Sequence, residues 1–434
     1  MPSVFPFLRL YALTSVSVLA PLCAERLVLF PMLERSFNAA GIPSGFGQWT
    51  WAYSIVLFVS LSVAQGSSYC ILRHCGGKSE GERWRIFSLA RTHLRRVGGP
   101  GMVASAIYVC FSSDYHVAAR IWPLLLLAVL LAWYQGQALV LGALLRVEGK
   151  LEGLFFAAVG FSTVLAIGTV LIAHARPLED DWMCWMLGCG CAATVAGVWR
   201  LARSCRIRGR AIAEGAVTPG VKLNKDPLRS DSGYASLVYI GDHSLTYLPR
   251  FFLGELGGMY SVGVFVASSS MAALFLAPVM LAGTVIMTVL SGMAEVEFRG
   301  RAKWGYFLAV LGVGLIVGIV TYFLLPGAMT YFYPSMHSEA DLVRLPLAVA
   351  AVGMASTALI RPMVLKVRGI HRVVLLSLAV TAFTGAACVA FCGQGLVASL
   401  WVYAGGTVAV LSVWLGFALL VRSGPTRAPT TTAV

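Results

Sequence analysis

The sequence has few charged residues for its length. Of its 434 residues, 12% are charged and 58% are hydrophobic, and the mean hydropathy is +0.79. A soluble domain of this size needs a surface on which about 25–35% of the residues are charged. The composition therefore excludes a soluble domain and indicates an all-α polytopic membrane protein.

The sequence also lacks the motifs of enzymes and metal sites. We find no nucleophile and base at catalytic spacing, and no group of histidines and cysteines at metal-ligand spacing. Cys189 and Cys191 would point to nearly opposite sides of a helix, and most of the ten cysteines lie in apolar runs, as buried small apolar residues do. We therefore expect a protein that is not an enzyme and that has no catalytic residue, metal or cofactor.

The net charge of +14 is concentrated in particular loops. Segments 73–96 and 200–232 hold most of the lysines and arginines. By the positive-inside rule these loops and both termini are cytoplasmic. The arginines are not interleaved with aromatic residues on one face, so we expect no nucleic-acid partner. Segment 73–96 fits either a short amphipathic helix on the membrane surface or a solvated basic loop.

Runs of about 20 apolar residues are long enough to span a bilayer as helices. The chain contains about twelve such runs, near 8–33, 47–72, 97–113, 121–145, 154–174, 182–201, 234–252, 259–292, 305–325, 343–365, 373–393 and 397–421.

The second half of the chain repeats features of the first. Gly47-Gln48-Trp49-x-x-Ala52 is echoed by Gly258-Met259-Tyr260-x-x-Gly263, and each segment opens the second helix of its half. The aromatic residues in these openings suit the membrane interface. Leu145-Arg146-Val147-Glu148-Gly149 is echoed by Leu365-Lys366-Val367-Arg368-Gly369, after the fourth helix of each half. Two echoes in register predict two six-helix parallel repeats.

The repeats define the expected organisation. We predict an N-terminal lobe at 1–201, a cytoplasmic linker at 202–232, a C-terminal lobe at 233–421 and a cytoplasmic tail at 422–434.

Two arginines lie inside apolar runs, where a charge at mid-membrane depth costs about 2.5–3.5 kcal/mol. Arg26 follows Glu25 in the first run, and Arg250 lies near the outer end of the seventh. A guanidinium matches phosphate geometry and stays charged, so both residues are candidate ligands of an anionic headgroup. A local pair between Arg26 and Glu25, or snorkelling of Arg250 to the interface, is the alternative.

Glu25 and Asp242 are candidate ion-coupling carboxylates, and they could equally be fixed counter-ions for the arginines. His243 adjoins Asp242 but points about 100° away around a helix, so a structural, hydrogen-bonded histidine is the alternative to a coupling role. Gln135 and Gln137 are candidate ligands of sugar hydroxyls, whereas bonds between helices are the more common use of such residues.

Several of these features together resemble the polysaccharide flippases, the O-antigen-type exporters of lipid-linked oligosaccharides in the multidrug/oligosaccharidyl-lipid/polysaccharide (MOP) superfamily. They are the twelve-helix count, the inner termini, the openings at Gly47 and Gly258, the turn at 146–150, and the segment from Asp242 to Gly263.

The resemblance implies a fold, a substrate and a location. It implies a V-shaped pair of six-helix lobes, like that of the multidrug and toxin extruders (MATE), working by alternating access. It also implies transport of undecaprenyl-pyrophosphate-linked oligosaccharide across the bacterial inner membrane for O-antigen (lipopolysaccharide), capsule or exopolysaccharide synthesis. Membrane lipids, protons or sodium ions, and other polysaccharide-assembly membrane proteins would be its partners.

Three other functions stay open at this stage. A multidrug extruder shares the fold, but its cavity would favour acids over Arg26 and Arg250. A membrane polysaccharide polymerase or ligase generally has a large outer loop, whereas the outer loops here are short. A scaffold without transport activity is the third alternative.

Overall fold

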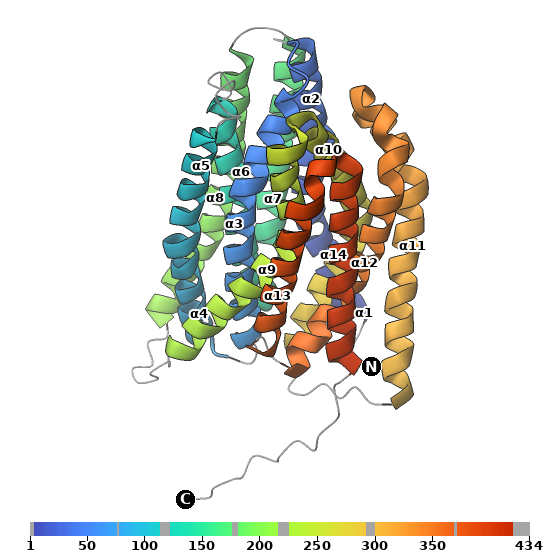
Figure 1. The fold of residues 1–434 in the computed structure, drawn as a ribbon. Helices are drawn as coiled ribbons and strands as arrows, with labels where there is room; N and C mark the ends of the chain where they lie inside the picture. The colour runs from blue at the N-terminus through green and yellow to red at the C-terminus, as the bar shows by residue number, and fades with distance from the viewer. Residues whose placement is uncertain are drawn as a thin grey trace, which may run out of the picture.

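A computed structural model describes residues 4–75, 78–112, 122–175, 181–215, 225–291, 300–368 and 371–419. All regular structure in these residues is helical, and the helices run side by side in one bundle (Figure 1). The predicted all-α fold is confirmed. Helix α1 begins and α14 ends at the same end of the bundle, which Figure 1 shows at the bottom and which we call the lower end.

The first half contains six continuous helical segments. Its first and third segments each include a short π-helical turn. The segments are α1 (Val4–Cys23) with η1 (Ala24–Leu29) and α2 (Phe30–Ala39); α3 (Gly45–His74); α4 (Glu80–His93) with η2 (Leu94–Gly98) and α5 (Gly99–Phe111); α6 (Trp122–Val147); α7 (Glu152–Ala175); and α8 (Trp182–Gly215).

The second half contains six more continuous helices and two short 3₁₀ turns. These elements are α9 (Lys225–Gly257), α10 (Met259–Ser291), α11 (Gly300–Phe332), η4 (Pro334–Glu339), α12 (Ala340–Arg368), α13 (His371–Phe391), η5 (Cys392–Gln394) and α14 (Leu396–Leu419).

Ten of these twelve segments are long and apolar enough to cross a membrane, so the described part of the chain is that of a multi-pass membrane protein. The other two are the segment that ends in α5 and helix α9. Helix α5 has 13 residues and follows the basic Arg95 and Arg96, and α9 carries Asp242 and Arg250 within its apolar part.

The same helix pairings recur in the two halves. Helix α3 packs on α6 and α6 on α8, and the equivalent helices α10, α12 and α14 pack in the same order. Helix α1 packs on α7 as α9 packs on α13. The halves meet where α3 contacts α9 and α10, and where α1 contacts α10. This arrangement is the two-lobe architecture predicted from the repeats.

The echoed openings of α3 and α10 lie against each other. A Cβ atom at Gly47 would overlap the carbonyl oxygen of Met259, and one at Gly263 would come within 3.4 Å of the Gly47 amide nitrogen. Glycine therefore lets the two backbones touch where the lobes cross. The neighbouring Gly258, with φ +93°, forms the one-residue turn between α9 and α10, in a backbone conformation that glycine adopts readily.

The tryptophans at the start of α3 are not interfacial, contrary to the expectation. Trp49 and Trp51 are both fully buried. The Trp49 indole donates to the Leu124 carbonyl oxygen (2.8 Å), and the Trp51 indole donates to that of Phe251 (3.3 Å) across the lobe boundary. Their polar N–H groups are satisfied inside the protein, so they act as core residues.

The basic segment before α5 is a helix, which is one of the two expectations, and not a loop. Residues 80–93 form α4, which starts with a capping box at Ser79 and continues through η2 into α5. Its apolar residues Ile86 and Phe87 are buried against the bundle. The capping bonds also hold the pKa of the half-buried Glu82 carboxyl below its ordinary value.

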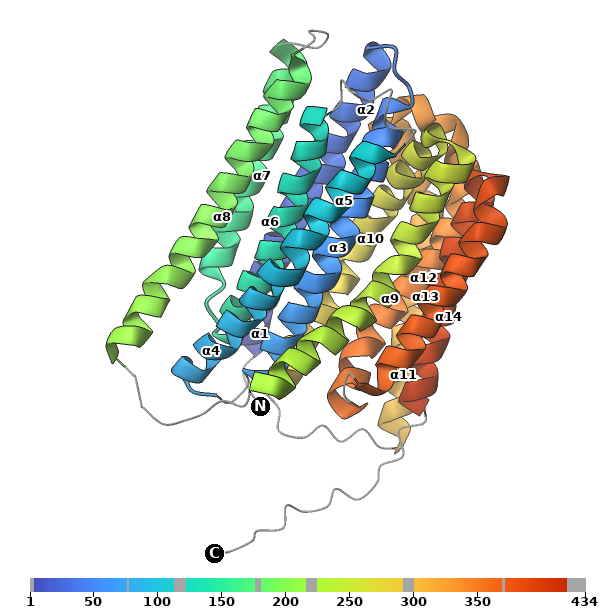
Figure 2. The same ribbon diagram turned by 60° about the vertical axis from the view of Figure 1, so that its left-hand side comes forward.

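Helices extend into the predicted linker from both sides. Helix α8 continues to Gly215, and α9 begins at Lys225. Figure 2 shows the first part of α9 at the lower end beside α4, from where the helix runs obliquely up the bundle. The predicted tail at 422–434 and the centre of the linker, 216–224, lie outside the described residues.

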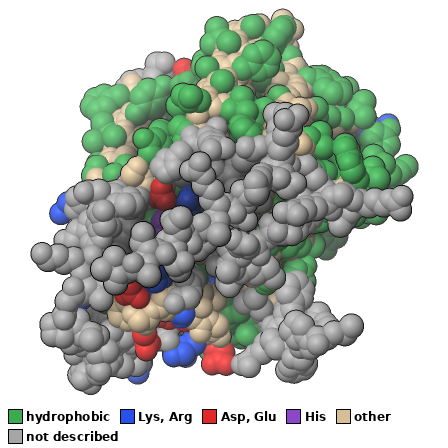
Figure 3. Space-filling view, turned by 90° about the horizontal axis from the view of Figure 1, so that it is seen from below, with side chains coloured by type: hydrophobic (Ala, Val, Ile, Leu, Met, Phe, Trp, Pro, Cys, Tyr) green, Lys and Arg blue, Asp and Glu red, His purple; other side chains and the backbone are tan. Residues whose placement is uncertain are grey.

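Charged groups join the halves at the lower end. The Asp231 carboxylate of α9 lies 2.8 Å from the His74 ring and 3.6 Å from the Arg73 guanidinium, both of α3. Figure 3, seen from this end, shows acidic and basic side chains gathered together, with hydrophobic side chains making up much of the other described surface.

The crossing of α3 and α10 gives a stability prediction. We expect Gly47→Val to lower the free energy of unfolding by about 1–3 kcal/mol or more, because the added side chain must displace the Met259 backbone. The control is Gly160→Ala in α7, where a Cβ meets nothing within 4 Å. Unfolding by sodium dodecyl sulfate titration in mixed micelles measures both, and equal stability of the two variants would contradict the close crossing.

Candidate functional site

Glu25 lies in the π-helical turn η1 and is almost fully buried, with 1% of its surface exposed. Its carboxylate accepts hydrogen bonds from Gln135 Nε2 (2.7 and 3.0 Å) and from the Tyr53 hydroxyl (3.2 Å). Gln135 Nε2 also donates to the Tyr53 hydroxyl oxygen (2.9 Å). The three side chains come from η1, α3 and α6, so this cluster joins helices within the first half.

Arg26 points away from that cluster toward the other half. Successive residues of a helix point about 100° apart, so Glu25 and Arg26 face different neighbours. The Arg26 guanidinium donates to the Ser270 hydroxyl of α10 and lies over the Phe30 ring, 4.8 Å from its centroid. The Arg26 backbone carbonyl accepts a hydrogen bond from Tyr333 (3.3 Å).

Arg250 is held at the same boundary from the opposite side. Only 5% of its surface is exposed, and its Nη2 donates to the Ser269 hydroxyl of α10 (2.9 Å). Its Nη1 is 3.5 Å from the Ser54 hydroxyl of α3. The rings of Tyr247 and Phe265 lie 5.4 Å from the guanidinium carbon. Two adjacent serines of α10 therefore bind the two arginines predicted to receive an anion.

Asp242 belongs to a separate pair inside the second half. Its Oδ2 lies 2.8 Å from Nη2 of Arg361 in α12. His243 faces elsewhere, as helical geometry requires: its ring lies 5.9 Å from the Tyr247 ring, and its buried Nε2 has no hydrogen-bond partner among the described residues.

Below the boundary arginines, a cavity of about 390 Å³ lies between the two halves. Its walls come from α1, α3, α6, α9, α10 and α12. Most of the lining is aliphatic, with leucines, alanines and methionines. Its lining residues on α3, α6 and α12 are close to the lower ends of those helices, so the cavity occupies the lower part of the bundle.

The charged residues that line this cavity are arginines. Arg146 and Arg361 both contribute to the lining, and no aspartate or glutamate is among the described lining residues. Arg146 is 6% exposed, and its Nε has no hydrogen-bond partner among the described residues. The charged side chains on the described cavity wall are therefore both cationic.

Neither of these arginines is among the predicted site residues: Arg146 is expected in the inner turn at 146–150, and Arg361 lies near the end of the apolar run 343–365. Helix α6 in fact continues to Val147 and α12 to Arg368, so each arginine lies within the fourth helix of its half. The signal in the sequence was the repeat of Leu145–Gly149 by Leu365–Gly369, which marks the ends of these two helices as equivalent.

The predicted site residues are thus divided among several places. Glu25 and Gln135 form one cluster, Arg26 and Arg250 lie at the lobe boundary, and Asp242 lies behind the cavity wall. Gln137 is buried in α6, and its Nε2 has no hydrogen-bond partner among the described residues. None of these residues lines the cavity itself, and their functions stay predictions.

The fold is that of MATE transporters of the MOP superfamily. A MATE family multidrug resistance transporter in an inward-facing conformation matches with a TM-score of 0.55 and 14% identity, over 94% of this chain and 93% of that one. A mutant of the Vibrio cholerae MATE transporter VcmN matches with a TM-score of 0.57 and 14% identity, over 97% and 98%.

A MOP superfamily transporter from Pyrococcus furiosus, described as having a binding pocket of reverse polarity, matches with a TM-score of 0.56 and 13% identity, over 95% and 94%. At these identities the likeness concerns the fold. No family model and no curated protein matches the sequence.

The two glutamines of α6 give a paired prediction. We expect Gln135→Leu to lower the free energy of unfolding by about 2–4 kcal/mol, because it removes the amide donor from a buried carboxylate. Gln137→Leu removes a buried amide whose nitrogen has no partner in the described part of the chain, so we expect a change below about 1 kcal/mol or a gain. Detergent titration compares the two, and a larger loss in Gln137→Leu would contradict the described cluster.

Proposed function

We propose that this protein is a flippase that moves undecaprenyl-pyrophosphate-linked oligosaccharides across the bacterial inner membrane by alternating access. The MATE-like fold supports a membrane transporter, and the family resemblance in the sequence suggests the substrate. We place both termini on the cytoplasmic side, and we assign the product to O-antigen, capsule or exopolysaccharide assembly by neighbouring membrane proteins.

The observation that carries this proposal is the polarity of the cavity. It is lined by Arg146 and Arg361 and by no described acid. Two guanidinium groups suit a diphosphate, because each can offer several N–H donors to phosphate oxygens. An extruder of cationic drugs needs the opposite charge, so the cavity disfavours that alternative. We therefore assign headgroup binding in this conformation to these two arginines.

The rest of the lining fits the other parts of such a substrate. The aliphatic wall can contact the isoprenoid chain next to the diphosphate, and Gln65, Ser68 and Thr284 can bind sugar hydroxyls. A volume of about 390 Å³ lies in the range of small-molecule pockets, roughly 300–1,000 Å³. It holds the diphosphate and its nearest groups, and a longer glycan requires a wider opening in another state of the cycle.

We assign the boundary arginines to that other state. Arg26 and Arg250 are bound by the hydroxyls of Ser270 and Ser269, which are neutral. A neutral partner leaves the positive charge available to an anion and can be exchanged without exposing a new charge. When the lobes separate at this boundary, Arg26 loses Ser270 and Arg250 loses its contact with Ser54, so both guanidinium groups face the opening and can receive the headgroup. Gln135 and Gln137 on α6 are kept as proposed ligands of the sugar.

We further propose that transport is coupled to protons or sodium ions through buried carboxylates, and that the protein catalyses no bond chemistry. Glu25 and Asp242 are the proposed coupling groups, each held by donors from another helix. His243 lies next to Asp242 in the chain and is kept as a secondary candidate.

The anion site predicts the result of a transport experiment. In cells that depend on this protein for surface polysaccharide, we expect Arg146→Gln and Arg361→Gln to reduce transfer of the lipid-linked saccharide to the outer leaflet at least tenfold. A charge-assisted hydrogen bond contributes about 1.5–3 kcal/mol, which corresponds to that factor. The measurement is the leaflet distribution of undecaprenyl-linked saccharide by protection from a membrane-impermeant oxidant.

The control is Arg344→Gln in the same helix, α12. Arg344 pairs with Asp341 (3.2 Å) and does not line the cavity, so we expect wild-type transfer. Saccharide that reaches the outer leaflet but stays unpolymerised would indicate an enzyme of a later step. An unchanged lipid pool, together with new sensitivity to cationic drugs in cells lacking the protein, would indicate an extruder.

The coupling proposal has its own test. We expect collapse of the proton and sodium gradients together to slow transfer at least tenfold in cells with the wild-type protein. Without a gradient, the buried carboxylates bind ions equally from both sides of the membrane, and ion binding no longer favours one direction of transport. Ionophores specific for one ion distinguish the two. Transfer that continues at its normal rate without either gradient would exclude ion coupling.

A further inference from the structure

Arg361 stands between the cavity and the Asp242 carboxylate. Its guanidinium is 2.8 Å from Asp242 Oδ2 and also lies against two aromatic rings, at 5.6 Å from Tyr239 and 5.5 Å from Trp414. Arg361 and Tyr239 line the cavity, whereas Asp242 does not. One guanidinium group is therefore shared by the substrate space on one side and an acid on the other.

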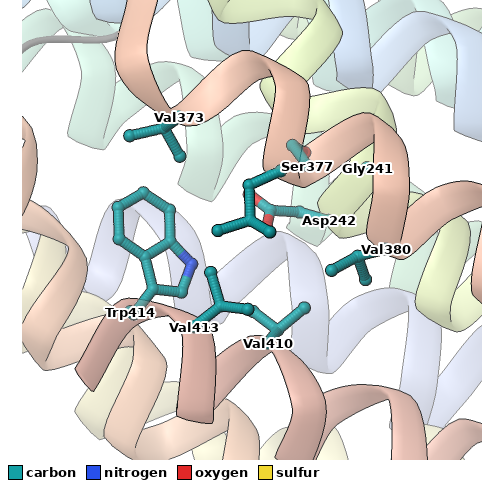
Figure 4. Close-up of a pocket in the computed structure, with 9 residues that line it drawn as sticks. Gly241, Asp242, Val373, Ser377, Val380, Val410, Val413 and Trp414 are labelled. Atoms are coloured by element: carbon teal, nitrogen blue, oxygen red, sulfur yellow. The ribbon is translucent and has the colours of Figure 1, made fainter. Parts of the chain in front are cut away.

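Asp242 lies in apolar surroundings apart from this arginine. Its side chain is 13% exposed and borders a second, water-sized void of about 10 Å³ between α9, α13 and α14. Figure 4 shows the carboxylate beside Ser377 of α13, across the void from Trp414 of α14. Among the described residues around the carboxylate, Arg361 is the fixed cation, and the titratable groups on its own helix are Tyr239 and His243.

An anion bound to Arg361 changes the electrostatics of Asp242 in two ways. It uses the positive charge that stabilises the carboxylate, and it adds a negative charge nearby. Both effects disfavour an ionised carboxylate in apolar surroundings, where an unpaired charge costs several kcal/mol. Protonation removes that cost without moving the backbone.

We propose that Asp242 takes up a proton when an anionic group binds Arg361, so that the ligand and the proton occupy the protein together. This inference rests on the proposed function, because it assigns the ligand of Arg361 to the diphosphate of the substrate. The proton comes from water and joins the carboxylate oxygen, and no other bond is made or broken. When the anion leaves, Arg361 pairs with Asp242 again, and the proton is released on the side of the membrane to which the anion leaves.

Proton uptake on binding tests this directly. The purified full chain in detergent is titrated with farnesyl diphosphate in weakly buffered solution, and a pH indicator reports protons while calorimetry reports binding. We expect about one more proton per bound diphosphate for the wild type than for Asp242→Asn. Protons that the diphosphate itself exchanges on binding contribute equally to both proteins, so they cancel when the two values are subtracted. We also expect Asp242→Asn to bind at least about tenfold more tightly, because no carboxylate competes for Arg361.

Asp341→Asn is the matched control, since it makes the same change in an exposed pair with Arg344. It should take up as many protons as the wild type. Equal uptake by wild type and Asp242→Asn overturns the inference, and loss of uptake in His243→Gln alone assigns the proton to the histidine and also overturns it. In both cases tight binding that is weakened by Arg361→Gln leaves the proposed function intact.

Failure of the proposed function gives a different result, namely no binding of farnesyl diphosphate to the wild type or no effect of Arg361→Gln on binding. Where Asp242→Asn does not yield folded protein, Arg361→Lys replaces it in the comparison. The ammonium keeps a charge but loses the forked geometry that reaches both partners, so proton uptake per bound diphosphate should fall by half or more. Unchanged uptake in this variant counts against the shared guanidinium.

Discussion

A charge inside this bundle has to be stabilised by other protein groups, because a bilayer interior offers no hydrogen bonds. Four charges inside the bundle meet that need through a different helix: Glu25 through α3 and α6, Asp242 through α12, Arg26 and Arg250 through α10. These bonds divide into two kinds. The bonds of Glu25, Asp242 and Arg250 to these partners lie within one half, whereas the bond of Arg26 to Ser270 crosses between the halves. The contacts of Asp231 with His74 and Arg73 at the lower end also cross, so separation of the lobes would break this second kind first.

The sequence predicted the helices well because apolar length and glycine turns are local properties. The twelve apolar runs correspond to the twelve continuous segments, and Gly258 directly precedes α10, close to the predicted start of that helix. The ends were less predictable: helix α4 begins at Glu80, since a capping box and two buried apolar residues outweigh its basic composition. The burial of Trp49 and Trp51 was missed because their partners, Leu124 and Phe251, lie far away in the chain.

The site was predictable in its residue types and not in its pairs. The sequence singles out Glu25, Arg26, Asp242 and Arg250, but nothing local identifies Ser269, Ser270 or Arg361 as their partners. Serine is common in these helices, and Arg361 lies at the end of an apolar run, close to the basic residues Lys366 and Arg368 of the inner side. Arg146 was overlooked for the same reason. The positive-inside pattern therefore hides an arginine whose side chain is buried at the inner end of a helix.

The contact between Gly47 and Gly263 also has a mechanical meaning. Two helices that touch through bare backbone have no side chains to interlock, so this point can act as a pivot. Residues 47 and 72 of α3 are 25 positions apart, which at 1.5 Å per residue is a lever of about 38 Å. A tilt of α3 by 10° about this point would displace its far end by roughly 6–7 Å, while the crossing hardly moves. A small change of the crossing angle at the glycines thus produces a large displacement of the helix ends around the cavity.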